Sequence, residues 1–145
     1  MRTLLVLLGL LAALPAAADL TPELTHQLAD AKYVYIQSER KSGEWSRPAE
    51  IWFFTDGGKL YVGTRPTSWR VRRIRAGRTK ARIAVGSPQG PTFEATGAVV
   101  RDPAVEARLL AAYAKKYPEG WAKFEQSFRD GFQSGERVLV QYTPR

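Results

Sequence analysis

The sequence predicts a mainly β protein with added helices, an α+β fold built on a six-stranded, mostly antiparallel β-barrel. Six segments are rich in β-branched and aromatic residues, and glycine-containing turns join several of them. A short, strongly basic helix is expected after the third strand, and a longer helical segment before the sixth. Together these features indicate a barrel with helices packed on it.

Alternating apolar and polar residues, together with turn sequences between them, predict the strands. They are expected, in chain order, at 33–38, 46–54, 59–64, 80–85, 92–101 and 137–143. Ser42-Gly43 and Asp56-Gly57-Gly58 supply the tight connections among the first three segments. Those three are therefore expected to be consecutive antiparallel strands.

Cap residues and apolar residues at helical spacing predict the helices. Thr21 followed by Pro22 is typical of a helix start, and a helix is expected from there to Ala31. Ser68 and Gly77 bound a short helix whose arginines are expected to point outward. A third helix begins after Asp102, and a fourth, separated from it by Tyr117-Pro118-Glu119-Gly120, is expected to stop at Gly131.

Residues 1–18 have the pattern of a Sec-type signal peptide. Arg2 precedes the apolar run 4–14, Pro15 ends that run, and Ala16-Ala17-Ala18 offers a cleavage site. The run is shorter than the roughly 20 residues of a membrane-spanning helix, so an uncleaved anchor is the less favoured reading. We expect a bacterial exported protein, periplasmic or secreted, with a single domain at 19–145 and no stable membrane insertion after cleavage.

Composition excludes several kinds of site. The 145-residue chain has no cysteine, which rules out disulfides, thiolate nucleophiles and thiolate metal sites. His26 is the single histidine, so no metal site is expected, and no serine lies in a nucleophile-elbow context. The formal net charge of +8 is concentrated in 65–82, which contains no acidic residue. Such a cluster at a strand-to-helix junction indicates an anionic ligand, with phosphate the leading candidate.

Three segments carry a family resemblance. They are Arg47-Pro48-Ala49-Glu50-Ile51-Trp52, Asp56-Gly57-Gly58-Lys59-Leu60-Tyr61-Val62-Gly63-Thr64 and Ser68-Trp69-Arg70-Val71-Arg72. Their pattern resembles the FMN- and deazaflavin-binding split β-barrel proteins of the pyridoxamine 5'-phosphate oxidase-like superfamily, over about residues 33–102. The resemblance implies a six-stranded antiparallel split β-barrel, a homodimer, and FMN or a deazaflavin as cofactor.

The resemblance also implies a site. In that family the end of the third strand and the start of the next helix hold the cofactor phosphate, and two positions of the second strand edge the flavin ring. With the neighbouring basic and aromatic residues, the expected cofactor-binding set is Arg47, Ala49, Thr64, Arg65, Ser68, Trp69, Arg70 and Arg72. Trp69 stands where the family usually has a non-aromatic residue, and it either stacks on a ring or fills the pocket. Catalytic residues stay unassigned, because in such sites the cofactor carries the chemistry.

The sequence is compatible with an oxidoreductase or with a non-catalytic binding protein, and a nucleic-acid binder is the least favoured function. The resemblance implies an exported oxidoreductase that transfers hydride to a small organic substrate. The alternative is a non-catalytic exported binding protein whose basic pocket holds a phosphorylated or other anionic small molecule. The pI of about 10.0 also suggests nucleic acid. Export would remove most such targets, so no nucleic-acid partner is expected.

Overall fold

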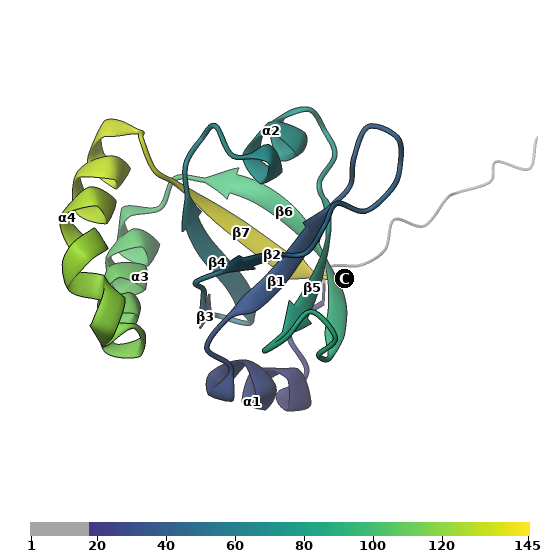
Figure 1. Cartoon of the computed structure of the whole chain (residues 1–145), viewed down its shortest axis with the longest axis horizontal. Helices are drawn as coiled ribbons and strands as arrows, with labels where there is room; N and C mark the ends of the chain where they lie inside the picture. Colours follow the sequence, from purple (N-terminus) through teal and green to yellow (C-terminus); the bar gives the residue numbers. More distant parts are fainter. Residues whose placement is uncertain (1–17) are drawn as a thin grey trace, which may run out of the picture.

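Seven antiparallel strands form one curled sheet in the computed structural model, which describes residues 18–145 (Figure 1). The strands are β1 (Val34–Ser38), β2 (Ala49–Ile51), β3 (Phe54–Asp56), β4 (Lys59–Thr64), β5 (Lys80–Val85), β6 (Thr92–Val100) and β7 (Val138–Pro144). Their order is β2-β1-β5-β6-β7-β4-β3, and every neighbouring pair is antiparallel. The two edge strands are separated only by Trp52 and Phe53, so the sheet must curl round on itself. The predicted split barrel is confirmed. The expected signal peptide, residues 1–18, lies outside the described residues except for Ala18.

The structure has one strand more than the six that were expected, because the segment 46–54 is not continuous. It breaks into β2 and β3 at Trp52 and Phe53. At this break the backbone pairs with side chains of α3 and of the residue that follows it. The Tyr117 hydroxyl accepts from the Phe53 N–H at 3.1 Å, and the Tyr113 hydroxyl donates to the Trp52 carbonyl at 2.9 Å. Backbone groups satisfied in this way need no strand partner.

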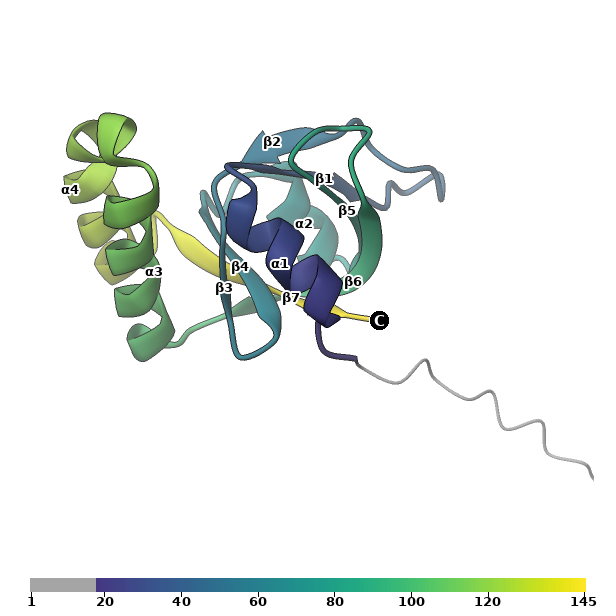
Figure 2. The same cartoon turned by 90° about the horizontal axis from the view of Figure 1, so that it is seen from below.

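Four helices surround the barrel: α1 (Pro22–Asp30), α2 (Trp69–Arg75), α3 (Pro103–Lys116) and α4 (Pro118–Ser134). α1 begins at the expected cap, where the Thr21 side chain accepts from the Leu24 N–H, and it covers the barrel with the buried Leu28. α3 and α4 lie together on one side of the sheet (Figure 2). α4 continues past Gly131, the expected stop, and ends at Gly135, whose φ of 85° suits a helix end. No helix within residues 18–145 is long and apolar enough to cross a membrane.

Two apolar clusters hold these layers together. The first fills the barrel, and its largest members are Tyr142, Phe53, Leu28, Leu60 and Ile83. The second lies between the sheet and the α3–α4 pair and is mainly aromatic; it includes Tyr113, Tyr117, Trp121, Phe128 and Phe132. The second cluster fixes α4 against the end of β4, where the candidate site lies.

The position of α2 depends on a glycine in β6. A Cβ added at Gly97 would lie 2.9 Å from Ile74 Cδ1 of α2 and 3.1 Å from Tyr142 Cε1. We expect Gly97→Ala to lower the free energy of unfolding by about 1–3 kcal/mol, because the extra methyl overpacks this contact. Urea denaturation measures the change, with the exposed neighbour Thr96→Ala as control. Equal stability of the two variants would show that α2 is not seated on Gly97.

Candidate functional site

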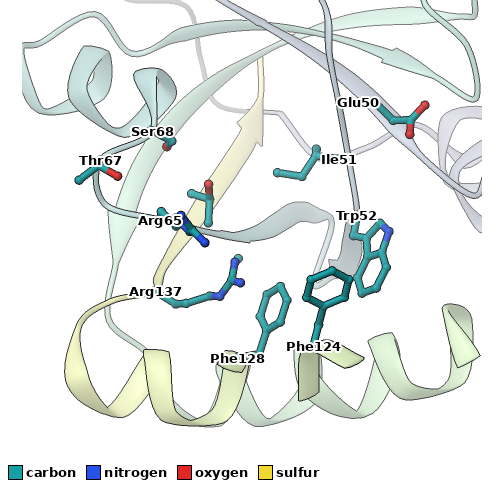
Figure 3. Close-up of a pocket in the computed structure, with 11 residues that line it drawn as sticks. Glu50, Ile51, Trp52, Arg65, Thr67, Ser68, Phe124, Phe128 and Arg137 are labelled. Atoms are coloured by element: carbon teal, nitrogen blue, oxygen red, sulfur yellow. The ribbon is translucent and has the colours of Figure 1, made fainter. Parts of the chain in front are cut away.

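Two cavities flank the start of α2, and Ser68 lines both of them. The first has a volume of about 510 Å³ and lies between β2, the end of β4 and α4 (Figure 3). Its lining residues are Glu50, Ile51, Trp52, Gly63, Thr64, Arg65, Thr67, Ser68, Phe124, Phe128 and Arg137. One end is therefore polar and cationic, and the other is aromatic.

The aromatic end is a wall of parallel and perpendicular rings. Trp52 stacks on Tyr117 with ring centroids 4.3 Å apart, and Phe124 meets Trp52 edge-on at 5.8 Å. Phe128 lies parallel to Trp52 at 6.5 Å. Gly63 of β4 allows this packing, because a Cβ there would lie 3.0 Å from Phe128 Cε1. The wall offers flat apolar surface to a planar ligand.

The second cavity is rich in arginine and has a volume of about 390 Å³. It is lined by Ile36, Ser38, Arg40, Ser46, Arg47, Ala49, Ser68, Trp69, Arg70 and Arg73. None of these residues is acidic. Arg73 Nη1 donates to Ser38 Oγ at 2.7 Å. Burial lowers the pKa of Arg73, and the charges of Arg40 and Arg78 lower it further. An anion entering this cavity would relieve that repulsion.

Two buried polar atoms that border the cavities have no hydrogen-bond partner in the described structure. They are Ser68 Oγ, which borders both cavities, and Arg70 Nη1, which borders the second. The Arg70 guanidinium also lies near the Tyr142 hydroxyl, whose pKa is raised by burial and lowered by Arg70. Buried polar groups are nearly always hydrogen-bonded, so such atoms call for a ligand or water. Ser68 precedes α2 as expected, yet its hydroxyl makes no cap hydrogen bond. Because α2 has only seven residues, anion binding here would depend on side chains rather than on a helix terminus.

The structure distributes the predicted site residues between the two cavities. Thr64 and Arg65 line the first, Ser68 lines both, and Arg47, Ala49, Trp69 and Arg70 line the second. Arg72 lines neither; it is exposed, with its guanidinium carbon 5.3 Å from the Trp69 ring centroid. Trp69 itself is 66% exposed, so it forms part of a rim rather than of the core.

Sequence reasoning missed part of the first cavity. No site role was predicted from the sequence for Trp52, Phe124, Phe128 or Arg137, yet all four line this cavity. These side chains reach the site from the β2–β3 break, from α4 and from the start of β7. Phe124 and Phe128 are four residues apart, a spacing typical of one helix face, but the spacing cannot identify the strand that this face covers. Within residues 18–145 no group of three or more His, Cys, Asp and Glu could hold a metal ion.

Comparisons with known proteins find a shared fold. No protein-family model and no curated protein matches the sequence. Three solved structures illustrate the match. A candidate pyridoxamine 5'-phosphate oxidase from Listeria innocua has a TM-score of 0.61 and 14% identity, covering 85% of this chain and 91% of its own. HutZ, the heme storage protein of Vibrio cholerae, has a TM-score of 0.60 and 14% identity, covering 88% of this chain and 92% of its own. An F420 reductase has a TM-score of 0.52 and 20% identity, covering 83% of this chain and 92% of its own. At these identities the likeness is one of fold.

Proposed function

We propose that this chain, which has the split-barrel fold of the pyridoxamine 5'-phosphate oxidase-like proteins, binds FMN or a deazaflavin and acts as an oxidoreductase on a small organic substrate. The observation that carries the proposal is the pair of cavities joined at Ser68, one acid-free and rich in arginine, the other aromatic. A flavin mononucleotide has the matching parts, an anionic phosphate and a planar ring system.

The residues of the second cavity fit a phosphate. Ser68 and Arg70 each present a buried, unpartnered polar atom, and Arg47 lines the same space. Arginine can bind phosphate oxygens through two parallel, charge-assisted hydrogen bonds. A phosphate here would satisfy both buried atoms and neutralise part of the arginine charge. Trp69 at the rim would limit access of water.

The residues of the first cavity fit the ring. Trp52, Phe124 and Phe128 form its wall, and a volume of about 510 Å³ lies within the usual range for small-ligand sites. Tyr113 anchors the Trp52 backbone, and burial raises the pKa of its hydroxyl, which keeps it a neutral donor. A cofactor bound here would supply hydride chemistry, while this chain would bind it, orient it and exclude water.

The names of the structural neighbours support a redox role. One is a candidate pyridoxamine 5'-phosphate oxidase, and another is an F420 reductase. HutZ is named as a heme storage protein. The single histidine of this chain, His26, lies exposed on α1 and does not line either cavity. The cavities therefore offer no imidazole ligand to a heme iron, and we favour the flavin-type cofactor.

Dimerisation and export belong to the same proposal. Trp69 and Phe124 are the large hydrophobic side chains that remain exposed in the described structure, and both border the cavities. A second copy of the chain placed over them would bury apolar surface and cover the cofactor. With export through the Sec pathway, the chain would acquire its cofactor after translocation.

The absorbance spectrum of the purified protein tests this proposal. Wild-type protein is incubated with FMN or with a deazaflavin, separated from free cofactor by gel filtration, and compared with Ser68→Ala. We expect a retained chromophore that is reduced by dithionite and reoxidised by an added electron acceptor. A protein that retains neither chromophore contradicts the proposal. Binding of glycerol phosphate without binding of either cofactor would instead favour a non-catalytic anion-binding protein.

A further inference from the structure

We propose that the substrate of this site carries a carboxylate or phosphate group, and that Arg65 and Arg137 hold this group at the polar end of the first cavity. The role of this anion as a substrate rests on the proposed function. Anion binding by Arg65 and Arg137 is independent of the proposed function and can be measured without any cofactor.

The two arginines are placed side by side by strand register. β4 and β7 are antiparallel, with Thr64 opposite Val138. Arg65 follows Thr64 and Arg137 precedes Val138, so the two arginines face each other one step beyond the paired strands. Figure 3 shows both side chains reaching into the cavity. Like charges directly opposite each other are destabilising, and an anion between them would offset that cost.

Among the described residues, no nearby carboxylate neutralises the charges of Arg65 and Arg137, which favours binding of an anion between them. Burial lowers the pKa of Arg137, and the charge of Arg65 lowers it further. Among residues 18–145, neither arginine has a carboxylate within ion-pair distance. The one acidic residue of the cavity, Glu50, accepts a hydrogen bond from the Tyr35 hydroxyl at 2.6 Å. Glu136 does not line the first cavity. It lines a smaller neighbouring cavity of about 300 Å³, which Arg65 and Arg137 also border.

Arg137 is held in position before any ligand binds. Its guanidinium carbon lies 3.9 Å from the centroid of the Phe128 ring, and Nη2 donates to Ser127 Oγ at 3.3 Å. Gly131 makes room for its stem, because a Cβ there would lie 2.4 Å from Arg137 Cγ. A preorganised guanidinium loses little freedom when it binds an anion.

The location identifies the anion as a substrate group. The second cavity already contains four arginines, and it contains the buried Arg70 Nη1 that suits a cofactor phosphate. Arg65 and Arg137 lie in the first cavity, with the aromatic wall. An anionic group held there is next to the position proposed for the ring. The substrate class is therefore a small organic acid or phosphate ester.

Benzoate and benzamide provide a matched test, because they differ in charge but hardly in shape. Binding of each to the cofactor-free protein is measured by calorimetry. We expect the wild type to prefer benzoate by at least about tenfold, as charged hydrogen bonds require. This preference should fall to within about twofold in Arg65→Gln and Arg137→Gln. It should persist in Arg129→Gln, which removes an exposed arginine of α4 that pairs with Glu125.

Three results would overturn the inference: no preference in the wild type, a preference that survives in both variants, or one that is lost in Arg70→Met instead. Thermal melting checks that each variant is folded, and the exposed Arg65 gives a second reading if Arg137→Gln is unstable. An FMN titration of the wild type separates the two proposals. A benzoate preference without FMN binding removes the cofactor proposal, whereas FMN binding without a benzoate preference removes this one.

Discussion

Replacing Tyr117 with alanine is expected to lower the free energy of unfolding by about 3–5 kcal/mol, the usual cost of deleting a buried aromatic side chain. Tyr117 is 2% exposed and stacks on Trp52 at 4.3 Å. Its hydroxyl donates to the Lys32 carbonyl at 2.7 Å and accepts from the Phe53 N–H at 3.1 Å. It therefore joins the α3–α4 corner to the segment that precedes β1 and to the β2–β3 break. Urea denaturation measures the loss.

The hydroxyl contribution can be isolated with a pair of phenylalanine variants. Tyr117→Phe leaves the buried Phe53 N–H without its partner, and we expect a loss of about 1–3 kcal/mol. Tyr35→Phe removes the solvent-facing bond to Glu50, and a change within about 0.5 kcal/mol is expected. Equal losses in the two variants would mean that Tyr117 does not satisfy the backbone at the break.

Replacing Arg70 with methionine is expected to weaken FMN binding by about 10- to 150-fold, which corresponds to the roughly 1.5–3 kcal/mol of a charged hydrogen bond. Methionine keeps much of the apolar stem but removes the guanidinium whose Nη1 is buried without a partner. The ligand-free protein should lose only about 1 kcal/mol, the typical net contribution of one hydrogen bond, because the guanidinium lies near the buried Tyr142 hydroxyl and lowers its pKa. Fluorescence titration and urea denaturation of the same samples measure the two quantities.

Arg75→Met is the matched control for Arg70→Met. Arg75 belongs to the same helix, is exposed, and does not line either cavity. We expect its FMN affinity to stay within about twofold of the wild type, as for most surface substitutions. Similar losses in both variants would indicate attraction to the overall charge rather than a site at Arg70. A large loss of stability in Arg70→Met would show that the guanidinium supports the fold.

Much of the barrel was predictable because its strands have local signals. The alternation in 33–38 and the Asp56-Gly57-Gly58 turn produce β1 and the β3–β4 hairpin almost as expected. The break at Trp52 and Phe53 was not predictable, because it depends on hydroxyls of α3 and the α3–α4 corner that arrive only in the tertiary structure. Local alternation cannot distinguish a backbone group that pairs with a strand from one that pairs with a side chain.

The candidate site was predictable where it follows the chain and not where distant elements meet. The stretch from Thr64 to Arg70 contains basic residues and Ser68, so the sequence indicated a candidate site in a stretch that borders both cavities. Arg137 is isolated in the sequence, and only the β4–β7 register places it opposite Arg65. The aromatic wall likewise depends on how α4 packs over Gly63. The family resemblance pointed to cavity-lining residues of the 64–70 stretch and to Arg47 and Ala49. The residues that reach the first cavity from α4 and β7 had no such signal.

A comparison of FMN with riboflavin tests the central claim most directly, because riboflavin has the same ring without the phosphate. Both are titrated into the wild type, Arg70→Met and Arg75→Met. The account predicts at least about tenfold tighter binding of FMN by the wild type and by Arg75→Met, and little difference between the two ligands for Arg70→Met. Equal affinity for FMN and riboflavin in the wild type, or binding of neither, would contradict a phosphate site in the arginine-rich cavity.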